Sequence, residues 1–370
     1  MWQTNIKRQQ IRLGGQRFTA ADRDTLRQLA GTASDPALRD AYAFLEEWFS
    51  PSPWIEVQTS GSTGSPKRMQ VEKTRMMHSA ARTCEYLGLG ADETALLCMN
   101  LKYIGAKMMV VRALLAGMRL QVRQPSGNPL AGFDEKIDFL AVVPLQLYHI
   151  LRNEEEKREL AKVRHVIVGG GAVDEALLPL LAPLPCHVFS TYGMTETLSH
   201  IALRPLNGPA ASERYTPFKG IGLSLSERQT LVIHAPDLCS NDLVTNDVAR
   251  LYADGTFTII GRADNTVNSG GIKIQIEEEE KRLKECIATP FALTSVADER
   301  LGEALVLLID NHYPADDDTL MSDIKSRMPR YHAPRKIIRV EKVPQTENGK
   351  INRKACRELA MGAPESKERE

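Results

Sequence analysis

Thr59-Ser60-Gly61-Ser62-Thr63-Gly64-Ser65-Pro66-Lys67 is the most informative stretch of this chain, because it has the composition of a phosphate-binding loop. Glycine permits positive φ and close approach, so that successive N–H groups can point at one anion. Lys67 adds a cation for phosphate. Pro66 stands where a Walker loop needs its second glycine. An exposed linker would have a similar composition, but predicted strands at 54–58 and 69–71 favour a hairpin turn.

The composition is that of an ordinary soluble protein. At 370 residues, the chain has room for two domains, or for one large domain with an appendage. Apolar residues make up 42% and charged residues 25%, which is typical of globular proteins. Lys+Arg and Asp+Glu both total 47, so no net charge favours capture of nucleic acid or of a membrane surface.

The cysteines and histidines indicate neither disulfides nor a metal centre built by the protein alone. The 6 cysteines are widely spaced without a CxxC pair, and the 8 histidines form no HxxxH pattern. The start of the chain lacks the apolar core of a signal peptide, and no segment has the length of apolar sequence that spans a membrane. We therefore expect a cytoplasmic protein that is not inserted in a membrane.

The order of predicted elements favours an α/β fold with a second, smaller domain. Helices are predicted at 17–50, 73–87 and 105–117, and β and α signals then alternate from residue 164 onward. The strand predicted at 187–190 runs into the polar loop 191–196, and ligand sites of α/β proteins lie at such strand ends.

Short strands are predicted from residue 230 to 260, and a compact α+β unit follows. The elements of that unit are a helix at 276–285, strands at 291–297 and 304–310, a helix at 317–328 and a strand at 336–341. We place the domain boundary at Asp264, which gives domains 1–263 and 264–370. Residues 362–370 are expected to be a disordered tail.

Four separated motifs share one explanation. They are the loop at 59–67, the Tyr-Gly-x-Thr-Glu run at 192–196, the Gly-Arg-x-Asp segment with its glycine turn at 261–273, and a Gly-Lys segment at 344–354. In this order they resemble the adenylate-forming superfamily of acyl-CoA synthetases, nonribosomal adenylation domains and luciferases. The resemblance covers residues 55 to 355. It implies a large N-terminal α/β domain, truncated relative to the superfamily, and a small mobile C-terminal α+β domain.

The resemblance also implies a two-step reaction with ATP, Mg²⁺ and CoA. A carboxylate attacks the α-phosphate of ATP, pyrophosphate leaves, and a thiol then displaces AMP; such chemistry rests on positioning and charge stabilisation. Glu196 would be the Mg²⁺ ligand, and Thr195 would donate to the α-phosphate. The pyrophosphate would be held by Thr59, Ser60, Gly61, Ser62, Thr63, Gly64 and Lys67. The adenine side of the site would be formed by Gly169, Gly170, Gly171, Thr191, Tyr192 and Gly193.

Asp247 is the expected contact of the ribose, and Arg262 is the expected second contact, to the ribose or to a phosphate. Asp247 ends Thr245-Asn246-Asp247, where the superfamily has Thr-Gly-Asp, so Asn246 replaces a glycine. Asn also accepts unusual φ, which makes the replacement tolerable. Taken alone, Asp247 would be interpreted as a solvated turn residue; its place in the order of motifs favours the ribose role.

Lys350 is the expected adenylation lysine, since it follows Gly349 in a Pro-x-Thr-x-x-Gly-Lys-x-x-Arg frame. Outside such a frame, a lysine near the end of a chain is usually a solvated charge. Asp264 is the expected hinge, and rotation there would exchange the face of the small domain that meets the active site. Gly270 and Gly271 would then line the path of the pantetheine arm.

The acid is predicted from residues 195–201, which resemble the corresponding run of o-succinylbenzoate–CoA ligases of menaquinone synthesis. Only 58 residues precede the phosphate loop, and in this shortness the chain resembles some bacterial ligases of that type. An acid with two carboxylates needs donors for the one that does not react. The candidates are Lys102, Tyr103, Ser199 and His200, each of which could equally be structural. Tyr103 occupies the place where related ligases have a histidine.

Two other functions remain open. One is another acyl- or aryl-CoA ligase, or an enzyme that loads a carrier protein, and use of CoA as acceptor separates these. The other is a nucleotide-binding protein without catalysis, which would bind ATP but not exchange pyrophosphate. In each case the expected partners are small molecules, with no nucleic acid.

Overall fold

The computed structural model describes residues 2–58, 68–345 and 351–362. By residue contacts, the described chain divides into two compact units. Unit 1 is Met1–Leu223, Ile233–Leu243 and Tyr252–Phe257, and unit 2 is Ser224–Val232, Val244–Leu251 and Thr258–Glu370. The predicted boundary at Asp264 lies within the last segment of unit 2 and stays a prediction.

Unit 1 is built on a nine-stranded sheet among the described residues, in the order β11-β10-β9-β8-β7-β5-β6-β1-β2. Its strands are β1 (Gln10–Leu13), β2 (Gln16–Thr19), β5 (Thr94–Leu97), β6 (Arg119–Val122), β7 (Phe139–Val142), β8 (His165–Val168), β9 (His187–Gly193), β10 (His200–Pro205) and β11 (Thr216–Pro217). The run from β9 to β1 is parallel, and β2, β10 and β11 pair antiparallel with their neighbours. The predicted α/β class is confirmed.

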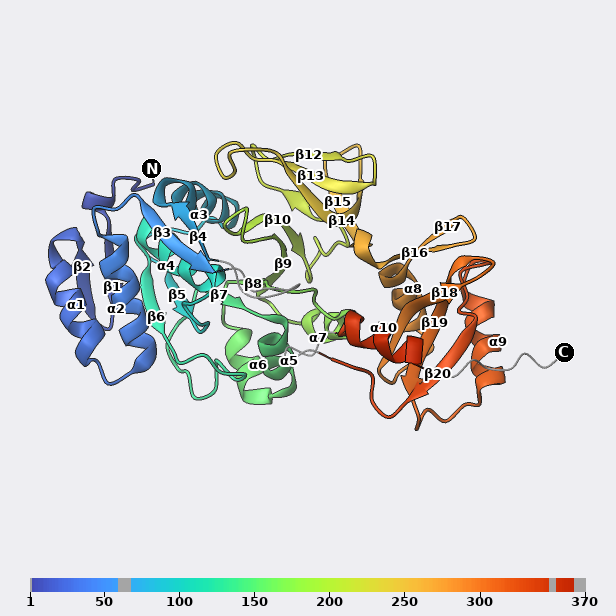
Figure 1. The fold of residues 1–370 in the computed structure, drawn as a ribbon. Helices are drawn as coiled ribbons and strands as arrows, with labels where there is room; N and C mark the ends of the chain where they lie inside the picture. Colours follow the sequence, from blue (N-terminus) through green and yellow to red (C-terminus); the bar gives the residue numbers. More distant parts are fainter. Residues whose placement is uncertain (1, 59–67, 346–350, 363–370) are drawn as a thin grey trace. The chain divides into compact units, whose positions relative to one another are not determined.

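Helices lie on both faces of this sheet. They are α1 (Arg23–Thr32), α2 (Pro36–Trp48), α3 (Lys73–Leu87), α4 (Ile104–Ala116), α5 (Pro144–Arg152), α6 (Glu154–Leu160) and α7 (Leu178–Leu181), with short 3₁₀ turns at Ile6–Arg8, Ala20–Asp22 and Glu175–Leu177. Figure 1 shows α1 and α2 beside the β1–β2 end of the sheet.

Alternate side chains of one strand enter different cores, as expected for a sheet covered on both faces. Leu97 of β5 packs with α2, α3 and α4, whereas Leu96 packs with α5, α6 and α7. All four residues of β5 are therefore buried. This explains why the strands in the middle of the chain have continuous apolar sequences rather than alternating ones.

The predicted hairpin around the phosphate-loop sequence is confirmed at its strands. β3 (Trp54–Gln58) and β4 (Arg68–Glu72) pair antiparallel, with Gln58 opposite Arg68. The residues between them, 59–67, lie outside the described residues, as does Lys350. Of the predicted tail 362–370, only Gly362 is described, as the last residue of a helix.

Two segments differ from their predicted secondary structure. The helix expected over 17–50 is strand β2 followed by α1 and α2, because Asp35 caps a new helix whose first residue is Pro36. The loop expected at 191–196 starts later, because β9 continues to Gly193 while it pairs with β10. Tyr192 and Gly193 are thus strand residues.

The remaining strands form two smaller sheets. One has the order β12-β13-β14-β15, made of β12 (Gly222–Leu225), β13 (Thr230–His234), β14 (Leu243–Leu251) and β15 (Phe257–Arg262). The other has the order β17-β16-β19-β18, with β20 also paired to β19. Its strands are β16 (Thr266–Ser269), β17 (Ile272–Gln275), β18 (Phe291–Asp298), β19 (Gly302–Asp310) and β20 (Lys336–Val340). A 3₁₀ turn, η4 (Ala263–Asn265), joins β15 to β16.

The sheet of β16 to β20 also separates two cores. Leu307 of β19 packs with α8 (Ile276–Leu283) and α9 (Asp317–Arg327), whereas Leu308 packs with α10 (Arg353–Gly362). Glu280 of α8 forms an ion pair of 2.6 Å with Arg353 of α10. The elements expected after residue 264 are thus present as one layered α+β unit.

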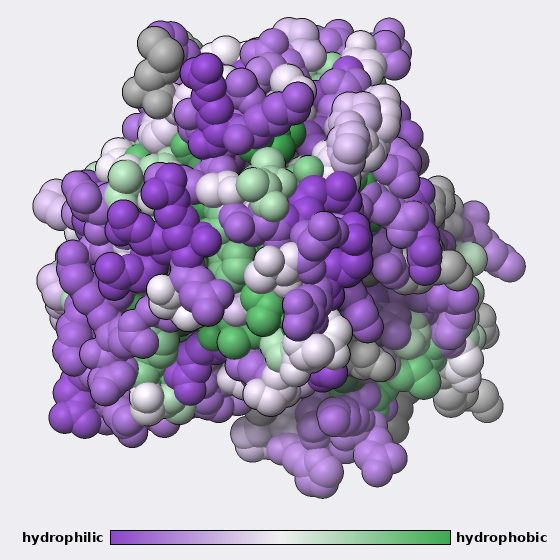
Figure 2. Space-filling model, turned by 90° about the vertical axis from the view of Figure 1, so that its left-hand side faces the viewer, coloured by the Kyte–Doolittle hydropathy of each residue, from purple (hydrophilic) through white to green (hydrophobic). Residues whose placement is uncertain are grey.

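The face drawn in Figure 2 is mainly hydrophilic, with hydrophobic residues visible in its middle and at its lower right. Among the described residues, no helix is both long and apolar enough to cross a membrane.

Candidate active site

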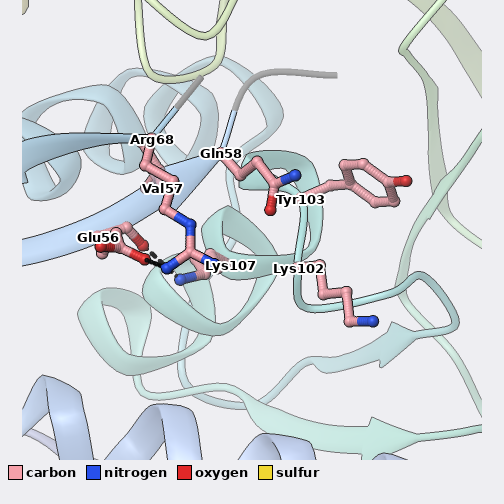
Figure 3. Close-up of a pocket in the computed structure, with 7 residues that line it drawn as sticks. All are labelled: Glu56, Val57, Gln58, Arg68, Lys102, Tyr103 and Lys107. Atoms are coloured by element: carbon pink, nitrogen blue, oxygen red, sulfur yellow. Dashed lines mark hydrogen bonds and ion pairs between the residues drawn. The ribbon is translucent and has the colours of Figure 1, made fainter. Parts of the chain in front are cut away.

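A pocket of about 530 Å³ lies beside the β3–β4 hairpin, at the end where Gln58 pairs with Arg68 (Figure 3). Its lining residues are Glu56, Val57, Gln58, Arg68, Lys102, Tyr103 and Lys107. The pocket thus contains two of the four residues predicted to hold the acid, Lys102 and Tyr103. It is bordered by Gln58 and Arg68, the residues on either side of the predicted phosphate loop.

Cations dominate this pocket, and Glu56 offsets part of their charge. Arg68 forms an ion pair of 3.3 Å with Glu56, and Lys107 donates to the Glu56 carbonyl oxygen at 2.6 Å. Burial lowers the pKa of Lys107. In Figure 3, Arg68 turns toward Glu56 while Lys102 and Tyr103 extend away from that pair. Lys102 forms no ion pair with any residue that the structure describes, so its ammonium is available to an anion.

Ser199 and His200, the other two predicted acid contacts, lie in a buried network that the pocket does not include. Arg112 of α4 donates from Nη2 to Ser199 Oγ at 2.6 Å. Ser199 Oγ lies 3.2 Å from His200 Nδ1, and His200 Nε2 lies 3.0 Å from Thr83 Oγ1. When Ser199 donates to Nδ1, Nε2–H donates to Thr83, and the Ser199 oxygen is then an acceptor for Arg112.

Burial sets the electrostatics of this network. Arg112 is 1% exposed, and burial lowers its pKa to about 10, so it stays charged at neutral pH. Burial first, and the Arg112 charge second, lower the pKa of His200 well below its ordinary value. His200 is therefore neutral there. Among the described residues, Arg112 has no carboxylate partner and its Nε has no hydrogen-bond acceptor.

Sequence reasoning missed Arg112, and also Lys107 and Arg68. A signal for Arg112 was present, because it is the one charged residue within the apolar run 108–115 of a predicted helix. Such a residue must be paired or hydrogen-bonded once the helix is buried. The partner, Ser199, lies 87 positions away in the sequence, and no local pattern indicates a contact over that separation.

The glycines near the predicted adenine site are required by packing of the protein itself. A Cβ on Gly193 would lie 2.4 Å from Ser199 O and from His200 Cα, and one on Gly169 would lie 2.8 Å from Thr191 Oγ1. Gly170 has a φ of +79°. Gly169, Gly170 and Gly171 directly follow β8, at the carboxyl end of that strand.

Tyr192 belongs to an aromatic group at the end of β9. Its ring lies 5.2 Å from Phe257 and 5.8 Å from Tyr215, measured between ring centroids. Tyr215 OH in turn lies 3.0 Å from Ser190 Oγ. The predicted adenine platform is therefore held by neighbouring rings, an arrangement that fixes a planar surface.

Thr195 and Glu196 lie in a tight turn between β9 and β10. Thr197 fixes the turn: its Oγ1 accepts from Met194 N at 3.0 Å and lies 2.7 Å from Ser199 O. Leu198, which follows, has a φ of +64°. The loop that carries the two predicted catalytic residues thus connects directly to the Arg112 network through Ser199.

The Glu196 carboxylate fits the predicted role of a Mg²⁺ ligand. Glu196 is exposed, and it forms no ion pair within the described part of the chain. A hard oxygen donor without a competing cation suits magnesium, which takes few protein ligands and keeps phosphate and water oxygens. No group of three or more potential ligands occurs among the described residues, so the protein would supply this carboxylate and the nucleotide would supply the rest.

Unit 2 brings the predicted ribose contacts together. Arg262 Nη1, at the end of β15, donates to Asp247 Oδ1 of β14 at 3.2 Å. Asp247 lies within a strand rather than in the turn that its sequence alone suggests. Gly270 and Gly271 form the two-residue turn between β16 and β17, with φ of +59° and +84°. Such a turn requires positive φ at both positions, which explains both glycines.

Comparison with known proteins assigns the family. The family described as "AMP-binding enzyme" matches residues 52–237, half of the chain.

This chain belongs to the AMP-binding enzyme family.

The resemblance predicted from the four motifs is thereby confirmed. Among relatives of this AMP-binding enzyme, the 2-succinylbenzoate–CoA ligase of Escherichia coli (strain K12) is 27% identical over 354 residues, covering 89% of this chain and 75% of the relative. That of Bacillus mycoides (strain KBAB4) is 23% identical over 350 residues, covering 86% and 73%.

A solved structure is also similar to this AMP-binding enzyme. It is the acyl-CoA synthetase (AMP-forming)/AMP-acid ligase II-like protein from Dyadobacter fermentans DSM 18053, which is 36% identical, with a TM-score of 0.62. The alignment covers 89% of this chain and 97% of the other. The adenylate-forming architecture expected from the sequence is therefore present over nearly the whole length.

Proposed function

We propose that this protein is an ATP-dependent acid–thiol ligase whose preferred acid is o-succinylbenzoate and whose acceptor is CoA. In the first step a carboxylate oxygen of the acid bonds to the α-phosphorus of ATP, and the bond to the bridging oxygen of pyrophosphate breaks. In the second step the CoA sulfur bonds to the acyl carbon and AMP leaves. Family membership and the names of the relatives support this reaction class.

One observation carries the choice of acid, and it is the buried Arg112 guanidinium. An isolated charge in a protein interior costs several kcal/mol unless an opposite charge and hydrogen bonds offset it. Among the described residues, Arg112 has only Ser199 Oγ and a weak contact to Met109 sulfur. A second carboxylate on the acid would supply the missing anion, and a guanidinium binds a carboxylate with two parallel hydrogen bonds.

The residues of the site divide the work of the first step. Glu196 would hold Mg²⁺, which supplies charge neutralisation at the phosphates. Thr195 would donate to the α-phosphate, Tyr192 would support the base, and Asp247 with Arg262 would bind the ribose. Lys350 and the loop 59–67 would bind the reacting acid and the pyrophosphate. In the second step, the turn of Gly270 and Gly271 would leave room for pantetheine.

The cationic pocket in Figure 3 gives a second place for an anion of the substrates. Lys102 and Tyr103 stay candidate contacts of the acid, alongside Ser199 and His200. The cations of the pocket, Lys102 and Arg68 among them, would attract the negatively charged substrates. Charge complementarity of this kind speeds association of charged ligands more than it tightens binding.

The test is release of pyrophosphate with a panel of carboxylic acids, with and without CoA. We expect release that depends on the acid, fastest with o-succinylbenzoate, and a thioester only when CoA is present. Equal rates with benzoates or fatty acids would refute the choice of acid. Acid-dependent pyrophosphate release with no thioester when CoA is added would favour an enzyme that loads a carrier protein. ATP binding without pyrophosphate exchange would favour a non-catalytic protein.

A further inference from the structure

Four polar side chains of unit 2 form a closed chain of contacts between β14 and the 3₁₀ turn after β15. Arg262 contacts Asp247 Oδ1 at 3.2 Å through Nη1 and Asp264 Oδ2 at 3.5 Å through Nη2. Asn246 Nδ2 donates to the same Asp264 oxygen at 2.8 Å. Asn246 and Asp247 are neighbours in β14, so the chain of contacts returns to its starting strand.

Asn246 is the unusual member of this group. The superfamily that the sequence resembles has a glycine at this position, and a glycine has no side chain with which to reach Asp264. The side chain of Asn246 is exposed, so burial in a core does not explain it. The hydrogen bond to Asp264 is the interaction that its side chain makes in this structure.

We propose that Asn246 is a positioning residue that holds the predicted hinge residue Asp264 against the ribose-binding strand. The proposal rests on the proposed function, which takes Asp247 as the ribose contact, and on the predicted hinge at Asp264. Through this bond, β14 restrains the side chain of the residue about which the small domain would turn. Rotation of Asp264 away from this arrangement must break the bond.

Bound nucleotide should affect the Asn246–Asp264 hydrogen bond less than it affects the neighbouring contacts of Arg262. Arg262 is shared between Asp247 and Asp264, so a ribose hydroxyl at Asp247 or a phosphate at Arg262 competes with its present contacts. The Asn246 amide involves neither of those groups. We therefore infer that Asn246 keeps its contact with Asp264 when nucleotide binds and Arg262 is redirected. Strand β14 would thus favour one conformation of the hinge at Asp264 throughout the adenylation step.

The strength of the contact fits a hinge that must still turn. The acceptor is a carboxylate, which strengthens a hydrogen bond, but the Asp264 side chain is 56% exposed, so water competes for it. Loss of such a bond should change the ratio of the two hinge conformations roughly threefold to tenfold. A change of this size alters rates without trapping the enzyme in either state.

The test uses Asn246→Ala, which removes the donor, and Asn246→Asp, which also sets a second carboxylate against Asp264. Val244→Ala is the matched control, since Val244 lies on the same strand and is 64% exposed. Two rates are measured: pyrophosphate exchange with acid and ATP, and thioester formation from added acyl-adenylate and CoA. We expect these rates to move in opposite directions in both Asn246 variants, more strongly in Asn246→Asp, and high salt should reduce the extra effect.

A merely structural role would give another result. Both rates would then fall together with the melting temperature, and that outcome would overturn the proposal, as would unchanged rates in both variants. Hydrogen exchange of the peptide spanning 262–269 gives a readout that needs no activity: it should quicken in Asn246→Ala and not in Val244→Ala. If the wild type exchanges pyrophosphate with no acid, the proposed function fails. Hydrogen exchange still tests the contact between Asn246 and Asp264 in that case.

Discussion

Arg112 on α4 donates a hydrogen bond of 2.6 Å to Ser199, a residue of the loop that carries Thr195 and Glu196. A buried cation is thereby connected to the strand end where the chemistry is proposed to occur. The same serine oxygen is shared with a neutral histidine, His200.

Replacing Arg112 with methionine should weaken binding of a dicarboxylic acid and leave folding intact. A hydrogen bond to a charged group contributes about 1.5–3 kcal/mol, so KM for o-succinylbenzoate should rise roughly 10- to 150-fold. KM for ATP should stay within about twofold. The melting temperature should hold or rise, because an apolar residue of similar volume replaces a buried charge.

Arg123→Met is the control, since Arg123 donates to the carbonyl oxygens of Pro129 and Ala131 and has no proposed part in binding. It should lower the melting temperature without changing KM for the acid. Steady-state kinetics and thermal unfolding of both variants decide the matter. An unchanged KM for the acid in Arg112→Met would refute the proposed contact.

Stability should fall as the pH drops from 6.5 toward 4, because of His165. Burial, followed by the charge of Arg164, lowers the pKa of His165 from 6.5 to about 4. Between those values the unfolded chain binds a proton that the native protein excludes, so stability is complete above pH 6.5. The loss by pH 4 is about 3 kcal/mol from this residue.

The measurement is the free energy of unfolding at several pH values for wild type and His165→Phe. The variant should lose less stability on acidification than the wild type. His149→Phe, which changes a partly exposed ring that packs against Tyr148, should follow the wild-type curve. His200, whose pKa is also lowered by burial, should leave part of the acid sensitivity in place.

Gly193→Ala should destabilise unit 1 strongly. The added Cβ would lie 2.4 Å from backbone atoms of Ser199 and His200, and paired strands cannot move apart without loss of their hydrogen bonds. We expect a loss of about 1–3 kcal/mol, as for other overpacked sites. Gly31→Ala in α1 meets no atom within 4 Å and should stabilise the helix slightly. Equal melting temperatures for the two variants would contradict the packing at Gly193.

Glu196→Gln should weaken the use of magnesium. The amide keeps the shape of the side chain but removes the charge that suits a hard cation. The Mg²⁺ concentration for half-maximal pyrophosphate release should rise at least about tenfold. Glu85→Gln on α3 serves as the control for loss of an acidic residue. A magnesium titration identical to that of the wild type would remove Glu196 from the metal site.

Local signals in the amino-acid sequence were enough to predict several elements. Helix α3 has the predicted bounds 73–87, because its apolar spacing is helical and Gly88 ends it with a φ of +62°. The strands on either side of the phosphate-loop sequence were predicted because turn residues separate two β-rich runs. The family was predicted from four motifs in order, since the residue types of each motif can be recognised without knowing how the chain folds.

Other features depend on how distant segments pack together. The extension of β9 to Gly193 depends on pairing with β10, and the pairing of β1 with β6 joins segments about a hundred residues apart. The contacts of Arg112 with Ser199 and of Asn246 with Asp264 have the same character. Periodicity shows that a residue is buried or exposed, but it carries no information on which distant residue completes its hydrogen bonds. That choice is made when the elements pack and each buried or charged group must find a partner.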